Sequence, residues 1–179
     1  MGKHNDAGNG VLPLSLLAVA LLTAAPATYS AELVFFDFDE AGSFSIEPER
    51  SATGITVALF GIADGTLTGF SGNPGSAAGG RSWDDGNAFV LDLDVLIAAT
   101  LNGISFDQRA SSSGPAAWEV LVNDIQIASG ATTTAFTSVN VPLADLPIGP
   151  GPLLLAVSGM GAASSGGTWR IDNLSLTGT

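Results

Sequence analysis

Carboxylate side chains lie close to both ends of this sequence, and they are the residues whose type and spacing could do chemistry. The segment Phe36-Asp37-Phe38-Asp39-Glu40 stands near the start, and Asp172 stands near the end. Carboxylates that share a site repel one another unless they hold a proton, a cation or hydrogen-bond donors. The elements that carry these two segments therefore decide whether the acids form a site.

The final segment predicts a β-strand with an irregularity at Asp172. Trp169 and Ile171 alternate with polar residues, but Leu174 and Leu176 fall on the opposite parity. A bulge at Asp172-Asn173 would return all four apolar side chains to one face. We therefore expect Asp172 to be held out of the regular ladder and to meet the acidic first strand across a sandwich.

The composition excludes most catalytic chemistry. The sequence has no cysteine, and its single histidine and single lysine are His4 and Lys3. Beyond the N-terminal segment, 16 of the 17 acids (all but Asp6) stand against four arginines, a net charge of −12. Triads with histidine, thiol nucleophiles, Schiff bases and common zinc sites are therefore excluded, and nucleic acid or anionic lipid would be repelled. A carboxylate-pair glycoside hydrolase is the one common mechanism left.

Two acidic pairs could serve such a hydrolase, Asp84-Asp85 and Asp92 with Asp94. In a retaining glycosidase the two carboxyl groups stand about 5 to 5.5 Å apart in a cleft. Asp92 and Asp94 alternate with the apolar residues of one strand, which places them on an exposed face instead. We therefore expect that the protein is not an enzyme.

Residues 1–27 have the features of a secretory signal peptide. The apolar run from Val11 to Ala25 is shorter than the roughly 20 residues of a membrane span, and small residues follow it. Cleavage is expected after Ala27 or Ala31, and an uncleaved N-terminal anchor is the alternative. Residues 28–179 are then expected to form a single secreted domain with no membrane span.

Short apolar runs separated by turn-forming residues predict an all-β domain, an antiparallel β-sandwich of about nine to eleven strands. Strands are expected at residues 33–38, 55–60, 66–70, 88–95, 104–107, 118–122, 125–127, 136–141, 153–158 and 169–176. The Asn123-Asp124 link predicts a type I′ hairpin. Residues 71–80 predict a loop without packing residues, and the prolines between Leu143 and Pro152 predict a rigid crossover loop.

Five segments, taken in order, resemble a group of exported bacterial proteins. They are Phe36-Asp37-Phe38-Asp39; Ser71-Gly72-Asn73-Pro74-Gly75-Ser76; Trp83-Asp84-Asp85; Ile104-Ser105-Phe106-Asp107-Gln108-Arg109 with Ser113-Gly114-Pro115 and Trp118; and Gly167-Thr168-Trp169-Arg170-Ile171-Asp172-Asn173-Leu174. The combination resembles the β-sandwich proteins of environmental bacteria that carry a PEP-CTERM sorting tag. This resemblance implies the cell surface or the exopolysaccharide matrix of a bacterium. The sequence ends at Thr177-Gly178-Thr179 without a Pro-Glu-Pro motif, so we expect either free secretion or a tag beyond this end.

The two acidic ends are also similar to those of jelly-roll carbohydrate-binding modules, which implies a jelly-roll or galactose-binding-like fold. In those modules the two ends share a structural calcium. The similarity implies Asp39 or Glu40, together with Asp172, as calcium ligands beside backbone carbonyls. Solvated surface charge is the alternative for these acids.

Two further residues are candidates for ligand binding. Trp83 follows a flexible stretch and stands between charged residues, so it is the candidate for an exposed platform that stacks on sugars. Arg109 could recognise a ligand, although an ion pair or a clamp on a loop carbonyl is the more common use of such a residue. Trp118 and Trp169 lie on apolar strand faces and are expected in the core.

Together these features predict a secreted, non-enzymatic surface or extracellular-matrix protein that interacts with polysaccharide or with matrix proteins. A carbohydrate-binding module with a defined glycan site near Trp83 or Arg109 is the first alternative. The carboxylate-pair glycoside hydrolase is the second.

Overall fold

The computed structural model describes Met1 and residues 30–40, 42–83 and 87–179. The expected signal peptide and the Asp84-Asp85 pair lie outside these residues. The described residues form fourteen strands and no helix, so they contain no helix that could cross a membrane. The strands are β1 (Ala31–Phe36), β2 (Asp39–Glu40), β3 (Ser43–Phe44), β4 (Arg50–Ser51), β5 (Ile55–Ile62), β6 (Thr68–Ser71), β7 (Ser76–Gly80), β8 (Ala88–Val95), β9 (Ala99–Ala110), β10 (Ala117–Val122), β11 (Ile125–Ala131), β12 (Thr137–Ile148), β13 (Gly151–Met160) and β14 (Trp169–Gly178).

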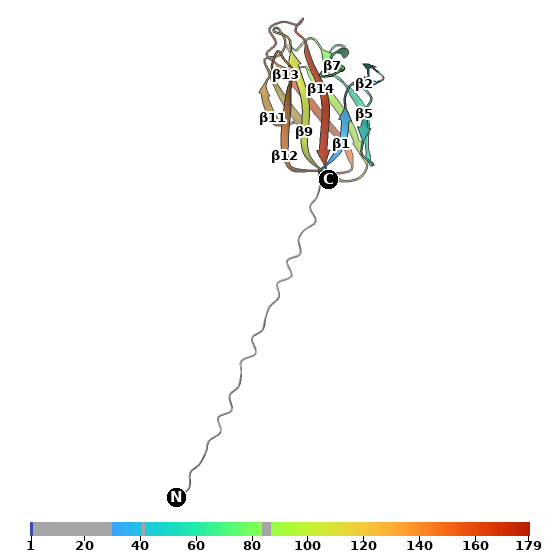
Figure 1. The fold of residues 1–179 in the computed structure, drawn as a ribbon, viewed down its shortest axis with the longest axis vertical. Coiled ribbons are helices and arrows are strands. Elements are labelled where there is room, and N and C mark those ends of the chain that lie inside the picture. The colour runs from blue at the N-terminus through green and yellow to red at the C-terminus, as the bar shows by residue number, and fades with distance from the viewer. Residues whose placement is uncertain (2–29, 41, 84–86) are drawn as a thin grey trace.

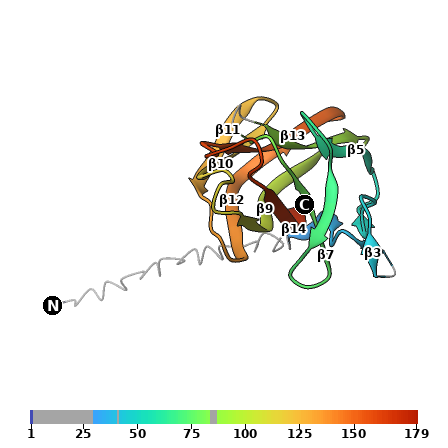
Figure 2. The same ribbon diagram turned by 90° about the horizontal axis from the view of Figure 1, so that it is seen from above.

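Two antiparallel sheets face each other, and the view from above shows them as two layers (Figure 2). One sheet has the order β12-β9-β14-β1-β4, with β7 also paired to β14 and β6 paired to β7. The other has the order β11-β10-β13-β8-β5. The expected antiparallel β-sandwich of jelly-roll type is confirmed.

Alternation along the strands builds the core between the layers. In β8, Phe89, Leu91, Leu93 and Val95 are buried while Asp94 is exposed, as the sequence pattern predicts. Apolar side chains of the facing sheet close the core from the other side. Burial of this apolar surface is the main favourable term in folding, and it explains why the domain needs no disulfide.

The last strand lies beside the first one in the larger sheet. Phe36 is the register partner of Leu174, and Ala31 is the partner of Gly178. Figure 1 shows β1 and β14 next to each other along the long axis of the sandwich. The prediction that Asp172 meets the acidic first segment across the sandwich is therefore wrong. Strands β14 and β1 are neighbours in one sheet, and Asp39 lies beyond the end of β1, on β2 of a separate two-stranded sheet with β3.

Three segments differ from the sequence-based expectations, each for a physical reason. The stretch 71–80 contains β7, because its small Ala77 and Ala78 fit against the sheet with no exposed surface. Strand β12 continues through its prolines to Ile148, because it is an edge strand and a register shift after Pro142 accommodates them. Strand β5 is an edge strand with a bulge and an exposed Leu59, so it is not buried throughout.

The predicted hairpin between β10 and β11 is confirmed. Asn123 and Asp124 have φ of 47° and 64°, the positive values that a type I′ turn requires at both central positions. The side chain of Asn123 also accepts a hydrogen bond from the backbone N–H of Leu154.

Candidate functional site

Strand β14 changes partners on one edge at Asp172 and Asn173. Residues Trp169 to Ile171 pair with β7, and residues from Leu174 onward pair with β1. On the other edge the register with β9 shifts between Asp172 and Ser175, and Asn173 has a positive φ of 49°. The predicted bulge is confirmed, and Trp169, Ile171, Leu174 and Leu176 are all buried. The bulge leaves backbone and side-chain polar groups at the change of partner to be satisfied in another way.

Asp172 satisfies these groups with both of its carboxylate oxygens. Oδ2 accepts the backbone N–H of Asn73 at 2.6 Å, and Oδ1 accepts the backbone N–H of Asn173 at 2.8 Å. The residue has no exposed surface. Burial raises the pKa of Asp172 to about 6, the two N–H donors oppose this rise, and the negative charges of Asp107 and Asp39 add to it.

Asp107 on β9 is the centre of a second set of hydrogen bonds. Its Oδ2 accepts the side-chain amides of Asn173 at 3.0 Å and of Asn73 at 3.3 Å, while its Oδ1 accepts the Ser138 hydroxyl at 2.5 Å. The Asn173 amide also donates to the carbonyl of Asn73. Two aspartates thus anchor the turn between β6 and β7 to β9, β12 and β14.

Asp39 reaches the same turn from the first segment of the chain. A Cβ at Gly75 would collide with its Oδ2, and a Cβ at Gly72 would lie 2.5 Å from Oδ2 of Asp172. Gly75 also has a φ of +72°, which favours glycine. The two glycines therefore let the turn fit closely between Asp39 and Asp172, and the expected meeting of the two acidic ends does occur.

The expected calcium ligands Asp39, Glu40 and Asp172 have different surroundings in the described part of the chain. Calcium binds about six to eight oxygens. Here N–H donors occupy both oxygens of Asp172, Glu40 is exposed, and only Oδ1 of Asp39 is buried without a partner. No group of three or more acidic, histidine or cysteine side chains within the described residues could hold a metal ion. The carboxylate of Asp172 is instead satisfied by one backbone N–H from the turn and one from β14.

A shallow trough begins at Asp107 and follows β9 along the outer face of the larger sheet. Two adjoining hollows of about 220 Å³ and 340 Å³ form it, and both are lined by Ser105 and Asn140. The full set of polar side chains along the two hollows is Ser105, Asp107, Ser138, Asn140, Asn173 and Thr177. Gly103 keeps the floor low, because a Cβ there would lie 3.0 Å from the Thr177 hydroxyl.

Arg109 and Arg170 lie above the Asp107 end of the trough. They are register partners on β9 and β14. The Arg170 guanidinium stacks on the Phe70 ring at 4.6 Å from its centroid and donates to Ser71, while Nε of Arg109 donates to the carbonyl of Thr134. The expected clamp of Arg109 on a loop carbonyl is confirmed.

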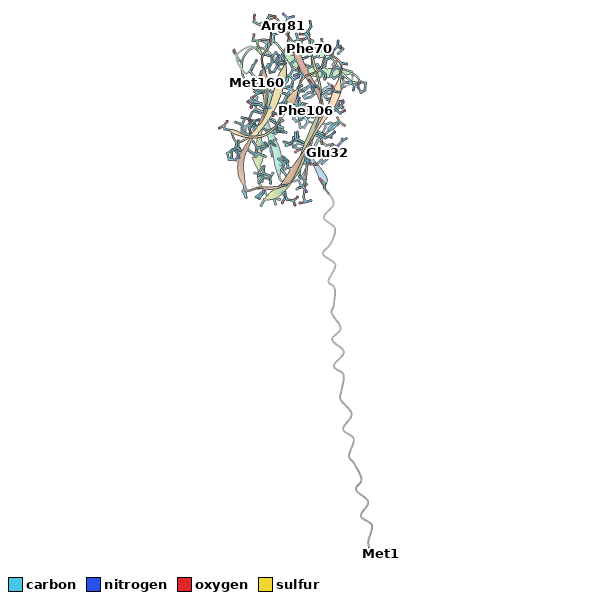
Figure 3. All side chains as sticks on the ribbon, turned by 90° about the vertical axis from the view of Figure 1, so that its left-hand side faces the viewer. Met1, Glu32, Phe70, Arg81, Phe106 and Met160 are labelled. Carbon is cyan, nitrogen blue, oxygen red and sulfur yellow. The ribbon has the colours of Figure 1, made fainter. Side chains whose placement is uncertain are left out.

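A further hollow of about 380 Å³ is lined by Phe70 and Arg81. Figure 3 shows Arg81 and Phe70 at the same end of the molecule, far from Glu32.

Trp83 is not an exposed platform, so that expectation is wrong. Its side chain has no exposed surface, packs against Phe89 and Trp169 with ring centroids 4.9 and 5.0 Å away, and donates to the carbonyl of Gly80. The prediction failed because a tryptophan between charged residues can still point into the core. Here Gly159 and Gly80, which have no Cβ, leave room for the ring. Trp118 and Trp169 are buried, as predicted.

Of the two candidate catalytic pairs, Asp92 and Asp94 are the one within the described residues, and they lie on a strand face. Asp94 is exposed and Asp92 is half-buried on the outward side of β8, as the alternation predicts. An apolar crevice of about 160 Å³ lies between β11, β12 and β13, and it is lined by Ile125, Ile127 and Leu146 among others, without an acidic side chain.

Sequence reasoning missed Asp107, Asn73 and Asn173 as partners of Asp172. Two signals could have found them. Asn73 stands between Gly72 and Pro74 in a turn-forming segment, and Asp107 is the acidic residue in an alternating strand that also carries Arg109. Neither signal gives the register that joins the three segments, because β7, β9 and β14 are distant in the sequence.

No protein-family model matches the chain, and no curated protein matches it. Solved carbohydrate-binding modules share its layered β architecture. A mutant family 29 module in complex with mannohexaose is 13% identical, with 84% of this chain and 93% of that chain covered and a TM-score of 0.48. A family 36 module of a xylanase from the hindgut metagenome of Trinervitermes trinervoides is 9% identical, with 70% and 96% covered and a TM-score of 0.47.

A family 36 module in complex with calcium and xylotriose is 14% identical, with 68% of this chain and 98% of that chain covered and a TM-score of 0.43. Because all three TM-scores are below 0.5, the ligands of these modules are not transferred to this chain on likeness alone.

Proposed function

We propose that this protein is a non-enzymatic β-sandwich that binds polysaccharide along the trough over β9. The trough carries the proposal, because its two adjoining hollows share Ser105 and Asn140 and have hydroxyl, amide and carboxylate groups along them. Sugar hydroxyls both donate and accept hydrogen bonds, so a surface that recognises them needs both kinds of group. Asn140, Ser105 and Thr177 offer both, and Asp107 accepts.

The hydrogen-bond network around Asp107 supports this role because it fixes the upper end of the trough. Asn173, Asn73 and Ser138 hold the Asp107 carboxylate in one orientation, so less side-chain entropy is lost when a ligand binds. The shallow form of the trough suits one side of an extended chain better than a small enclosed ligand. We expect modest affinity, because an arginine lies over the ring of Phe35 and another lies over the ring of Phe70. These two rings are therefore not free to stack on a sugar.

The proposed location is outside the cell, at the surface or in the extracellular matrix of a bacterium. The apolar segment from Val11 to Ala25 and the resemblance to PEP-CTERM proteins support it. Matrix proteins remain a second class of partner. The proposal includes no calcium, because amide N–H groups occupy the oxygens of Asp172.

Affinity electrophoresis of residues 28–179 through gels that contain single polysaccharides tests the proposal. The gels contain glucuronoxylan, xanthan, galactomannan, β-glucan or dextran. We expect retardation by at least one of them, and we expect Asn140→Ala and Ser105→Ile to reduce it, because the first removes an amide and the second fills the trough. Thr56→Ile, a matched change on the exposed face of β5 in the opposite sheet, should have no effect.

Two results would contradict the proposal. Retardation that is equal in the trough variants and the unchanged protein would place binding elsewhere. Release of reducing ends from any of these polysaccharides would support the hydrolase alternative instead.

A further inference from the structure

Positive charge is scarce in this protein, yet two arginines stand side by side on the outer face of the larger sheet. The net charge is −12, and Arg109 and Arg170 are direct cross-strand partners. Like charges directly opposite each other on a sheet destabilise it. Burial lowers the pKa of Arg170, and the positive charge of Arg109 lowers it further. Because this pairing destabilises the sheet, folding does not explain why both residues are arginine.

Neither arginine of this pair has a carboxylate partner among the described residues. The ion pair between Arg50 and Glu32 is the only one found within them, at 2.5 Å. Asp107, the nearest acid along the same face of β9, directs its oxygens to Asn73, Asn173 and Ser138. The charges of Arg109 and Arg170 are therefore not neutralised within this part of the protein.

Neutral contacts hold both guanidinium groups in place while leaving donors unused. Arg109 uses only its Nε, which donates a hydrogen bond to the carbonyl of Thr134. Arg170 uses one terminal nitrogen, which donates to Ser71, and its guanidinium lies over the Phe70 ring. Gly79 makes this stacking possible, because a Cβ there would collide with the Phe70 ring. Each guanidinium has five N–H donors in a planar fork, so oriented donors remain on both.

We propose that Arg109 and Arg170 form a basic subsite for carboxylate or sulfate-ester groups on a polysaccharide that lies in the trough over β9. The inference rests on the proposed function, because the trough supplies the contacts to the rest of the polymer. The unused donors of each forked guanidinium match the oxygens of a carboxylate or a sulfate, and such charge-assisted hydrogen bonds are stronger than neutral ones. The ligand class that we infer is therefore an acidic polysaccharide.

The charge of the whole protein adds a limit on the density of charge in the ligand. With a net charge of −12, a polymer with a negative group on every sugar would be repelled over most of the surface. Screening leaves the attraction within roughly 8 Å of the arginine pair at physiological salt. A polymer with an occasional acidic group on a neutral backbone therefore fits best.

The test compares acidic polysaccharides with the same polymers after their charge is removed. Glucuronoxylan and xanthan are compared with their carboxyl-reduced forms, and dextran with few sulfate groups is compared with plain dextran. The first two comparisons report on a carboxylate and the third on a sulfate. For at least one polymer we expect about tenfold tighter binding of the acidic form, the size of one charge-assisted hydrogen bond. Polygalacturonate, which is densely charged, should bind more weakly than that polymer.

Variants assign the effect to the arginine pair. Arg109→Gln and Arg170→Gln should each reduce the preference for the acidic form, whereas Arg50→Gln, on the same face but paired with Glu32, should keep it in full. The lysine variants Arg109→Lys and Arg170→Lys keep the charge and should keep part of the preference. Thermal unfolding of every variant shows whether a loss reflects folding instead.

Each outcome decides between the two proposals. Equal binding of acidic and neutral forms, with trough variants still weakened, would overturn the oxyanion subsite and leave polysaccharide binding intact. A preference for acidic forms that survives in full in both glutamine variants would also overturn it. No binding of any of these polymers, acidic or neutral, would overturn both proposals.

Discussion

At the scale of single residues, Asp172 is buried with a raised pKa, and this links its protonation to folding. Its pKa is about 6 in the folded protein against an ordinary 3.8. The folded state therefore keeps a proton that the unfolded chain releases between about pH 4 and 6. Stability is highest below this window, falls as the pH rises through it, and is constant above it as far as this group is concerned.

The change Asp172→Asn should remove this part of the pH dependence. A shift of about two units corresponds to on the order of 2 to 3 kcal/mol. We expect the difference in unfolding free energy between pH 4 and pH 7, measured by urea denaturation, to change by that amount in the variant. Asp94→Asn, on an exposed acid, is the control. Identical pH profiles for the variant and the unchanged protein would show that Asp172 ionises normally despite its burial.

Gly75 and Gly65 separate the effect of backbone conformation from the effect of close packing. Both have positive φ, +72° and +95°, but only at Gly75 would a Cβ collide with another residue, Asp39. Gly65→Ala should lower stability by about 1 kcal/mol, the usual cost of this conformation. Gly75→Ala should lower it by about 1 to 3 kcal/mol more, because the turn must move away from Asp39. Equal losses in thermal unfolding would mean that the turn has room to shift.

At the scale of elements, the chain shows which features the sequence could predict and which it could not. The strand β8, the hairpin turn and the bulge in β14 follow from local alternation and from residues that accept positive φ, so they were predictable. Strand β7 was not, because its alanines and glycines carry no apolar pattern. The end of β12 was not, because the position of a strand at the sheet edge, where prolines are tolerated, depends on the whole topology.

The candidate site divides in the same way. The meeting of Asp172 with the first acidic segment could be predicted from the phase slip, since a bulge there must be satisfied by neighbouring groups. The hydrogen bonds from Asn73 and Asn173 to Asp172 could not be predicted. The Asn73 bond depends on the register between strands that are distant in the sequence. The inward turn of Trp83 likewise depends on Gly80, Phe89 and Trp169 meeting in the core.

The hairpin between β10 and β11 offers a prediction at this scale. Asp124 adopts a φ of 64° that costs a residue with a Cβ more than it costs glycine, and Asn-Gly is the preferred pair for a type I′ turn. Asp124→Gly should therefore raise the free energy of unfolding by about 0.5 to 1 kcal/mol. Asp124→Ala removes the same negative charge but keeps a Cβ, so it should give no such gain. A gain of equal size in both variants would assign the effect to charge alone.

At the scale of the whole molecule, the arrangement of charge is uneven. Acids outnumber basic residues, but Arg81 lies at the same end of the sandwich as Phe70 (Figure 3). Arg170 contacts Ser71, next to the turn between β6 and β7, and Arg109 is the cross-strand partner of Arg170. A net charge of −12 favours solubility but destabilises the compact state through self-repulsion. Within this negatively charged protein, the pair Arg109 and Arg170 is a local site of positive charge that can attract an anion.

This unequal charge predicts how salts act on stability. Raising NaCl from 0.01 to 0.5 M should raise the midpoint of thermal unfolding, because screening shortens the reach of the repulsion from about 30 Å to well under 10 Å. CaCl2 should give the same rise as MgCl2 at equal ionic strength. Both oxygens of Asp172 already accept N–H groups, so no formed calcium site adds to the screening.

A calcium-specific rise that disappears in Asp172→Asn and in Asp39→Asn would contradict this prediction. It would mean that the turn from Gly72 to Gly75 moves and gives up its amide donors to the ion, with the free Oδ1 of Asp39 as one ligand. If that rise is absent, hydrogen bonds alone hold the first acidic segment, the turn and Asp172 together. The domain would then keep its trough and its arginine pair in place whatever the calcium concentration around it.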